Sequence, residues 1–309
     1  MTIAILCSGQ GTQHRDMFAL TAKAPEAAAV FAAATQALDG RDPRAIVRED
    51  NAEALHANAL AQMLSCTQAL AAFVALKDAL GARLAIAGYS VGELASWGCV
   101  GLFSPAAIID LALQRAAFMD EVSGPDEGLA FVRGLDRAKV DAICARFGAA
   151  IAIINPGEAF VLGGRRDDLR ALCDEAQNMG ATHVGALSVS VASHTPRLVK
   201  ASVNFRRVLA AQRPAQRLAP GVRLFSGIDA VAVLDIDAGL DKLAAQISHT
   251  IDWEACLNAC IEAGVDRFLE LGPGGALATM ASAAYPGVNA RSLEDFRSLD
   301  GVRAWLARA

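Results

Sequence analysis

The chain of 309 residues has little of the chemistry that several functional classes require. Its five histidines are scattered and its seven cysteines form no Cys-x-x-Cys pair, so no metal site is predicted. Cys256 and Cys260 lie four residues apart, a spacing that suits one helix face better than a disulfide. The formal net charge is −5 and no basic run occurs, so nucleic-acid binding is not expected.

The sequence also lacks long apolar runs and a recognisable targeting segment. No stretch of about 18 consecutive apolar residues appears, so no membrane-spanning helix is predicted. The first residues, Met1–Leu6, read as a strand and lack the basic region of a secretory signal peptide. Together with the cysteine usage, this favours a reduced, cytoplasmic protein.

Strand-like and helix-like segments alternate along the chain. This order predicts an α/β fold with a mostly parallel sheet. The predicted strands of the sheet are Ile3–Cys7, Leu84–Gly88, Arg223–Ser226 and Arg267–Leu271. The predicted helices are one or two over 52–80, one over Pro105–Val122 with Ser104 as its N-cap, one from Pro196, others around 239–263, and two near the end of the chain.

The middle of the chain has a different order. The loop Ser123–Gly128 marks a boundary, and the following segments read as β-α-β-β-α-β, which is the ferredoxin-like pattern. We therefore expect a ferredoxin-like subdomain at about 124–190, inserted into a large α/β domain formed by 1–123 and 191–309.

The pentapeptide Gly88-Tyr89-Ser90-Val91-Gly92 is the most informative motif. It lies between an apolar strand and a helix, where Gly-x-Ser-x-Gly forms a nucleophile elbow with the serine hydroxyl at the helix N-terminus. Ser90 is therefore the candidate nucleophile. The alternative is a glycine-rich turn with a surface serine.

A serine nucleophile needs a base, and an imidazole is the usual one. His194 follows a strand and precedes a helix, a position at the edge of the sheet where an elbow serine also lies. It is the preferred candidate, and the other four remain open: His14, His56, His183 and His249.

Two further features suggest substrate binding. The turn Gly9–Gln13 lacks the glycine pattern of a dinucleotide loop and the Gly-Lys-Ser/Thr of a P-loop. It is better interpreted as an oxyanion loop whose backbone N–H acts with that of Val91, although an ordinary tight turn remains possible. Arg115 interrupts an apolar helix. It is interpreted as a fork for a substrate carboxylate, and the alternatives are a solvated helix face or a salt bridge to Asp110 or Asp120.

Taken together, these motifs resemble those of the malonyl-CoA:acyl-carrier-protein transacylases and the acyltransferase domains of polyketide synthases. The resemblance covers nearly the whole chain and depends on the order of several separated motifs: Gly9-Gln10-Gly11-Thr12-Gln13, Thr67-Gln68, Gly88-x-Ser90-x-Gly92-Glu93, Gln114-Arg115 followed by Phe118-Met119, Ser193-His194, and Glu270-Leu271-Gly272-Pro273-Gly274.

The resemblance implies an α/β-hydrolase-like core with a ferredoxin-like insert, no metal and no bound cofactor. Ser90 would carry the acyl group, and His194 would act as general base and then general acid. Arg115 would bind the malonyl carboxylate, and the backbone N–H groups of Gln10 and Val91 would form the oxyanion hole. The donor would be malonyl-CoA and the acceptor a phosphopantetheine-type thiol on an acyl carrier protein.

The resemblance also implies that a main-chain carbonyl near Ser248–Trp253 orients the histidine. Three positions depart from the common family pattern: Tyr89 replaces His, Ser8 replaces Pro, and Asp252 replaces Gln. These departures favour a specialised malonyl transferase, such as the epsilon subunit of malonate decarboxylase. A serine hydrolase or thioesterase with the same elbow, and a scaffold subunit with a relic site, are the competing hypotheses.

Overall fold

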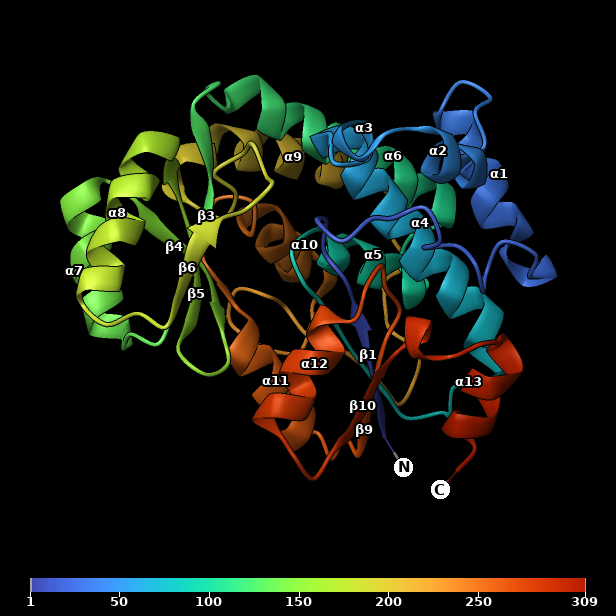
Figure 1. The fold of residues 1–309 in the computed structure, drawn as a ribbon. Coiled ribbons are helices and arrows are strands. Elements are labelled where there is room, and N and C mark those ends of the chain that lie inside the picture. Colours follow the sequence, from blue (N-terminus) through green and yellow to red (C-terminus); the bar gives the residue numbers. More distant parts are fainter. Residues whose placement is uncertain (1, 309) are drawn as a thin grey trace.

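Two five-stranded sheets organise the chain, and the computed structural model describes residues 2–308, without the side chain of residue 52 (Figure 1). The first sheet has the order β10-β9-β1-β2-β7, and all of its strand pairs are parallel. Its strands are β1 (Ile3–Cys7), β2 (Leu84–Gly88), β7 (Val222–Leu224), β9 (Arg267–Glu270) and β10 (Asn289–Ser292). The predicted parallel α/β core is confirmed.

Strand β1 is central in this sheet and is buried on both faces. Ile3, Ile5 and Cys7 pack into one apolar cluster, and Ala4 and Leu6 pack into another. This is the period of two that a strand imposes, and burial on both sides explains why its sequence is continuously apolar.

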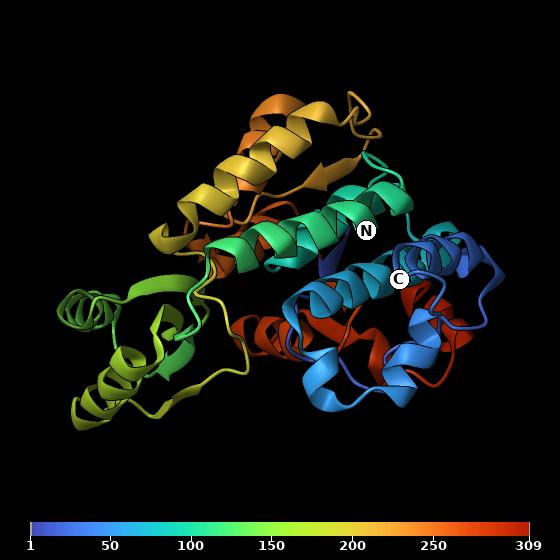
Figure 2. The ribbon, with the colours of Figure 1, turned by 90° about the horizontal axis from the view of Figure 1, so that it is seen from above.

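Helices cover both faces of the first sheet. On the Ile5 side they are α1 (Ala28–Ala37), α2 (Pro43–Glu49), α4 (Asn58–Leu76), α5 (Val91–Cys99), α6 (Pro105–Val122), α9 (Val199–Ala211), α10 (Ile236–Ala245) and α13 (Leu299–Leu306). On the Leu6 side they are α11 (Trp253–Glu262) and α12 (Ala276–Ala284). The short helix α3 (Ala52–Leu55) precedes α4, which lies beside α6 (Figure 2).

The second sheet forms the smaller subdomain, seen at the left of Figure 1. Its elements follow the predicted β-α-β-β-α-β order: β3 (Glu127–Arg133), α7 (Arg137–Phe147), β4 (Ala150–Asn155), β5 (Ala159–Arg165), α8 (Arg166–Asn178) and β6 (His183–Ala186). The strand order β6-β3-β5-β4 is that of a ferredoxin-like sheet, as expected.

One strand of the second sheet comes from outside this segment. Strand β8 (Ile251–Asp252) pairs in parallel with β4, and Thr250 Oγ1 donates to the Ile151 carbonyl at 2.7 Å. The chain that follows α10 therefore attaches the large domain to the smaller one. This strand was not predicted, because two residues are too few to produce a periodic pattern.

Helix α4 is the most apolar long helix of the fold. With the turn that follows it, over Asn58–Ala79, it is long and apolar enough to cross a membrane, but 83% of its most apolar window is buried inside the protein. It is accordingly a core helix, which agrees with the expectation that the chain has no membrane span.

Two glycines allow the turn between β2 and α5 to lie close to its neighbours. A Cβ on Gly88 would come within 2.1 Å of the Glu93 nitrogen, and one on Gly92 within 2.1 Å of the Cys7 carbonyl oxygen. A side chain at Gly88 would push the start of α5 away from β2, and one at Gly92 would push it away from β1. The two glycines of the motif thus set the position of the residue between them.

We expect Gly92→Ala to lower the free energy of unfolding by more than about 2 kcal/mol, because its methyl group would overlap a fixed backbone carbonyl. Gly81→Ala is the matched control, since no atom lies within 4 Å of the point where its new methyl group would sit, and we expect a change within about 0.5 kcal/mol. Urea unfolding of both variants measures the difference. Equal stabilities would show that α5 can shift without cost.

Candidate active site

Ser90 lies at the turn between β2 and α5, where it is the N-cap residue of the helix. Its backbone has φ 55° and ψ −121°, a region that side-chain-bearing residues rarely adopt. The turn projects the hydroxyl from the end of the sheet, as the motif predicted. The strain is held by the packing of Gly88 and Gly92 on either side.

His194 is the histidine that the fold brings to Ser90. The Ser90 Oγ and the His194 Nε2 are 2.8 Å apart, and the His194 Nδ1 is 2.6 Å from the carbonyl oxygen of Gln246. Because a carbonyl only accepts, Nδ1 carries the proton and Nε2 is free to accept from the serine. The tautomer needed for a general base is therefore fixed by a main-chain group.

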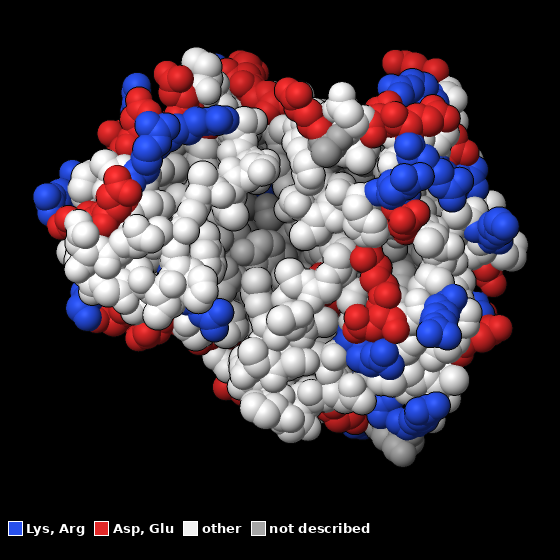
Figure 3. Space-filling view, viewed as in Figure 1, with Lys and Arg blue, Asp and Glu red and all other residues white. Residues whose placement is uncertain are grey.

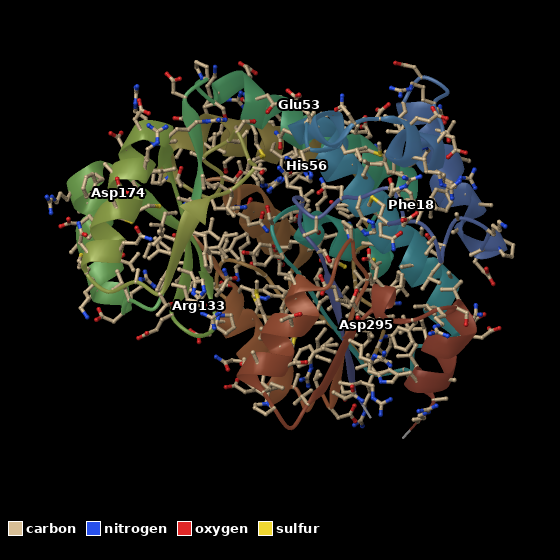
Figure 4. All side chains as sticks on the ribbon, in the orientation of Figure 1. Phe18, Glu53, His56, Arg133, Asp174 and Asp295 are labelled. Carbon is tan, nitrogen blue, oxygen red and sulfur yellow. The ribbon has the colours of Figure 1, made fainter. Side chains whose placement is uncertain are left out.

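The other four histidines lie elsewhere. His14 pairs with Glu294 at 3.0 Å, His183 bonds to Thr182 at 3.2 Å, and His249 bonds to the Ala245 carbonyl at 2.9 Å. His56 lies between α3 and α4, near the top of the large domain (Figure 4).

The imidazole of His194 is 1% exposed and stays neutral. Burial lowers its pKa to about 3, and the charge of Arg115 acts in the same direction, against the opposing effect of the Gln246 carbonyl. A neutral imidazole at neutral pH is the form that accepts a proton from serine.

Arg115, on α6, is 1% exposed and its guanidinium contacts two neutral amides. Nη1 donates to Gln62 Oε1 at 2.6 Å, and Nη2 donates to Gln246 Oε1 at 3.2 Å. Within residues 2–308, no carboxylate lies within 4.0 Å of it, so the ion pairs considered with Asp110 and Asp120 are not formed. Burial lowers its pKa to about 10, so it is still a cation at neutral pH.

Gln246 connects these three residues. Its Nε2 donates to the Ser90 carbonyl at 3.0 Å, its Oε1 accepts from Arg115, and its main-chain oxygen accepts from His194. It also ends α10, where the helix dipole places partial negative charge on the last carbonyls. This carbonyl occupies the place that a carboxylate has in a Ser-His-Asp triad.

The predicted oxyanion donors are the backbone N–H groups of Gln10, in the loop after β1, and of Val91, directly after Ser90. Both belong to loop or helix-start positions, and neither donates to a protein acceptor among residues 2–308. Gln10 and Ser90 line a small cavity of about 80 Å³ together with His194. Two such donors, one in the loop after β1 and one at the N-terminus of α5, are what an oxyanion hole requires.

A wider cleft of about 420 Å³ adjoins the small cavity and shares Gln10 and Tyr89 with it. Phe131 and Val161 of the smaller subdomain form one wall, and Met280 of the large domain lies on the other. Figure 3 shows a hollow between the two parts with mostly uncharged walls, and charged residues around its rim. The approach to Ser90 is therefore lined mainly by uncharged residues.

Comparison with known proteins identifies the family. The sequence model described as "Acyl transferase domain" matches residues 5–223. The chain belongs to this acyl transferase family.

Individual acyl transferases match over almost the full chain. Malonyl CoA-acyl carrier protein transacylase of Mycobacterium bovis is 28% identical over 302 residues, covering 96% of this chain and 98% of that protein. The Escherichia coli K12 protein of the same name is 28% identical over 300 residues, covering 94% of this chain and 96% of that protein.

Among solved structures, MCAT from Mycobacterium tuberculosis has a TM-score of 0.89 at 28% identity, with 100% of each chain covered. The acyl-carrier-protein S-malonyltransferase of Burkholderia pseudomallei has a TM-score of 0.91 at 26% identity, with 98% of this chain and 100% of that chain covered. The predicted family resemblance is thus confirmed.

The three departures from the common acyl transferase pattern have local explanations. Ser8 donates from Oγ to the buried carboxyl group of Glu270 at 2.7 Å, which a proline could not do. Tyr89 packs edge-on against Trp253 with ring centroids 5.4 Å apart. Asp252 caps α11 by accepting from the Ala255 N–H at 2.9 Å.

Sequence reasoning missed the amides that surround the cation. Asn58 Oδ1 accepts from both Gln10 Nε2 at 3.2 Å and Gln62 Nε2 at 2.8 Å, which links the loop that contains Gln10 to Arg115. The available signal was the pair Asn58 and Gln62, two buried amides four residues apart on a mostly apolar helix. The carbonyl that orients His194 was placed near Ser248–Trp253, and the structure assigns it to Gln246, just before that segment.

We expect the ring of His194 to stay neutral from pH 7 down to pH 5. Its pKa is lowered to about 3, so protonation begins well below the usual imidazole value of about 6.5. Ring ¹⁵N NMR measures this, and the resonances are assigned by their loss in His194→Ala. The same variant should acylate about 10²–10⁴-fold more slowly. A titration midpoint between pH 6 and 7 would contradict the prediction that the His194 ring stays neutral down to pH 5.

Proposed function

We propose that this acyl transferase moves a malonyl group from malonyl-CoA, through an ester on Ser90, to the phosphopantetheine-type thiol of an acyl carrier protein. The Ser90–His194–Gln246 arrangement supports acyl transfer. The buried Arg115 cation, with no carboxylate partner among residues 2–308, is the observation that points to a malonyl group.

The first half-reaction forms the acyl-enzyme. Ser90 Oγ attacks the thioester carbonyl carbon while His194 Nε2 takes its proton, and the free N–H groups of Gln10 and Val91 stabilise the oxyanion. Collapse of the intermediate breaks the carbon–sulfur bond, and His194 returns the proton to the departing CoA sulfur. The carrier thiol then attacks the ester by the same steps in reverse, which releases malonyl thioester and restores Ser90.

Arg115 supplies the selectivity for a carboxylate. Its guanidinium is separated from Ser90 by the side chain of Gln246, which bonds to both. A malonyl carboxylate is two carbons from the ester oxygen of Ser90, so in this proposal it takes the place of an amide oxygen against the guanidinium. A charge-assisted bidentate pair in a buried site is stronger than the neutral contact it replaces.

The relatives support the donor and the acceptor in this proposal. The proteins from Mycobacterium bovis and Escherichia coli are both named for malonyl-CoA and an acyl carrier protein, and each matches almost the whole chain. We further propose a cytoplasmic enzyme in fatty-acid or polyketide synthesis, or a specialised malonyl transferase such as the malonate decarboxylase epsilon subunit. We also propose that the chain is divided into a large domain, formed by residues 1–123 and 191–309, and an inserted smaller subdomain, residues 124–190.

We expect intact-protein mass spectrometry to detect one malonyl group after incubation with malonyl-CoA, and peptide mapping to locate it at Ser90. Ser90→Ala should lose the adduct, because no other nucleophile is placed at His194 within the described chain. Its unfolding midpoint should stay close to that of the parent protein. An adduct retained in Ser90→Ala would refute the assignment of the nucleophile.

We expect Arg115 to determine the preference for malonyl over acetyl thioesters. The pair should contribute about 1.5–3 kcal/mol, or roughly 10- to 150-fold in kcat/KM. Arg115→Ala should remove most of this preference, and Arg115→Lys should restore part of it, because lysine keeps the charge but not the fork. The kcat/KM values for both thioesters decide this. The same ratio in all three proteins would make Arg115 a structural residue.

A further inference from the structure

Glu93 is a buried acid that the acyl transfer steps do not use. It lies in the first turn of α5, three residues after Ser90, and is 1% exposed. Its Oε2 accepts from Gln246 Nε2 at 2.6 Å and from the Gly227 N–H at 3.1 Å. No hydrogen bond joins its side chain to Ser90 or His194 within the described chain.

The contact between Glu93 and Gln246 determines the orientation of the Gln246 side-chain amide. A primary amide can be turned over at little cost unless its partners distinguish oxygen from nitrogen. Here Arg115 offers only donors, and Glu93 together with the Ser90 carbonyl offers acceptors. The amide oxygen is thereby held toward the cation, and the amide nitrogen toward Glu93 and the nucleophile.

A glycine on a separate segment makes room for this carboxyl group. A Cβ on Gly227 would come within 2.7 Å of Glu93 Oε2 and within 3.5 Å of Gln246 Nε2. The Gly227 carbonyl in turn accepts from the Asp252 N–H at 2.9 Å, so this segment is fixed to β8. The Glu93 carboxyl group, which accepts from Gln246, is therefore held both by its own helix α5 and by the segment that contains Gly227.

The bonds to Glu93 require a hydrogen-bond acceptor and do not require that its carboxyl group be charged. Burial raises the pKa of Glu93 to about 7, partly opposed by the bonds from Gly227 and Gln246 and by the charge of Arg115, while Asp229 raises it further. With a proton on Oε1, Oε2 can still accept both bonds. A glutamine at this position keeps an acceptor of the same shape.

We propose that Glu93 is a positioning residue for acyl transfer: through Gln246 it holds both the carbonyl that orients His194 and the amide oxygen that faces Arg115. This inference rests on the proposed Ser90–His194 chemistry, but its first test does not depend on the malonyl group.

The test compares four variants of the full chain: Glu93→Ala, Glu93→Gln, Gly227→Ala and Ser96→Ala. Gly227→Ala pushes on the same carboxyl oxygen without changing the acid. Ser96→Ala is the matched control, because its buried hydroxyl bonds the backbone carbonyl of Glu93, at 2.6 Å, and not the carboxyl group. The readouts are the p-nitrophenol burst from p-nitrophenyl acetate, malonyl-CoA acylation, and the ¹H resonance of the His194 Nδ1–H proton.

We expect Glu93→Ala and Gly227→Ala to lower the burst rate about 10- to 100-fold, with KM changed much less, since buried hydrogen bonds are left unmade. The His194 Nδ1–H resonance should move upfield in both as its bond to Gln246 lengthens. Glu93→Gln and Ser96→Ala should keep the rate and the resonance close to those of the parent. The malonyl-to-acetyl preference should fall in Glu93→Ala.

Two results would overturn the inference. If Glu93→Ala and Gly227→Ala lose thermal stability but keep the burst rate and the resonance, Glu93 only supports the fold. If the burst rate of Glu93→Gln is as low as that of Glu93→Ala, hydrogen-bond acceptance is not the contribution of Glu93. A parent protein that gives a p-nitrophenol burst but no malonyl adduct would refute the proposed substrate and leave the test of Glu93 intact.

Discussion

Gln246 makes the contacts on which the geometry of the site depends. Its main-chain oxygen sets the tautomer of His194, and its side chain joins the Ser90 carbonyl to the guanidinium of Arg115. Gln246, His194 and Arg115 are each 1% exposed and Ser90 is partly buried, so each unmade bond would cost about 1–3 kcal/mol. Gln246 thus contacts the nucleophile, the base and the cation and connects them to each other.

The residues of the site come from elements that are far apart in the sequence. Ser90 lies at the end of β2, Arg115 on α6, and Gln246 at the end of α10. His194 follows the smaller subdomain, and its own N–H donates to the Ile247 carbonyl at 2.9 Å with a φ of 61°. Strand β8 then continues from this region into the second sheet. The small cavity that contains Ser90 and His194 adjoins the cleft between the two sheets.

The sequence predicted the parts of the fold and the site that leave a local pattern. Gly88 and Gly92 mark the elbow because no other residue fits there, and an arginine within an apolar helix is conspicuous. Gln246 could not be found in this way, since its main-chain oxygen is common to every residue. The short strands β8 and β10 and the early helices α1 and α2 were also missed, because their formation depends on pairing and packing with distant segments.

The claim that the elbow serves transfer and not hydrolysis is tested most directly by the lifetime of the acyl-enzyme. The malonylated protein, freed of malonyl-CoA, is followed by intact mass in buffer alone and with a phosphopantetheine-bearing carrier protein. We predict that the adduct persists in buffer and disappears rapidly when the carrier thiol is added, with the malonyl mass appearing on the carrier. Loss of the adduct at the same rate in both, with free malonate as the product, would identify a thioesterase and contradict the proposed transfer.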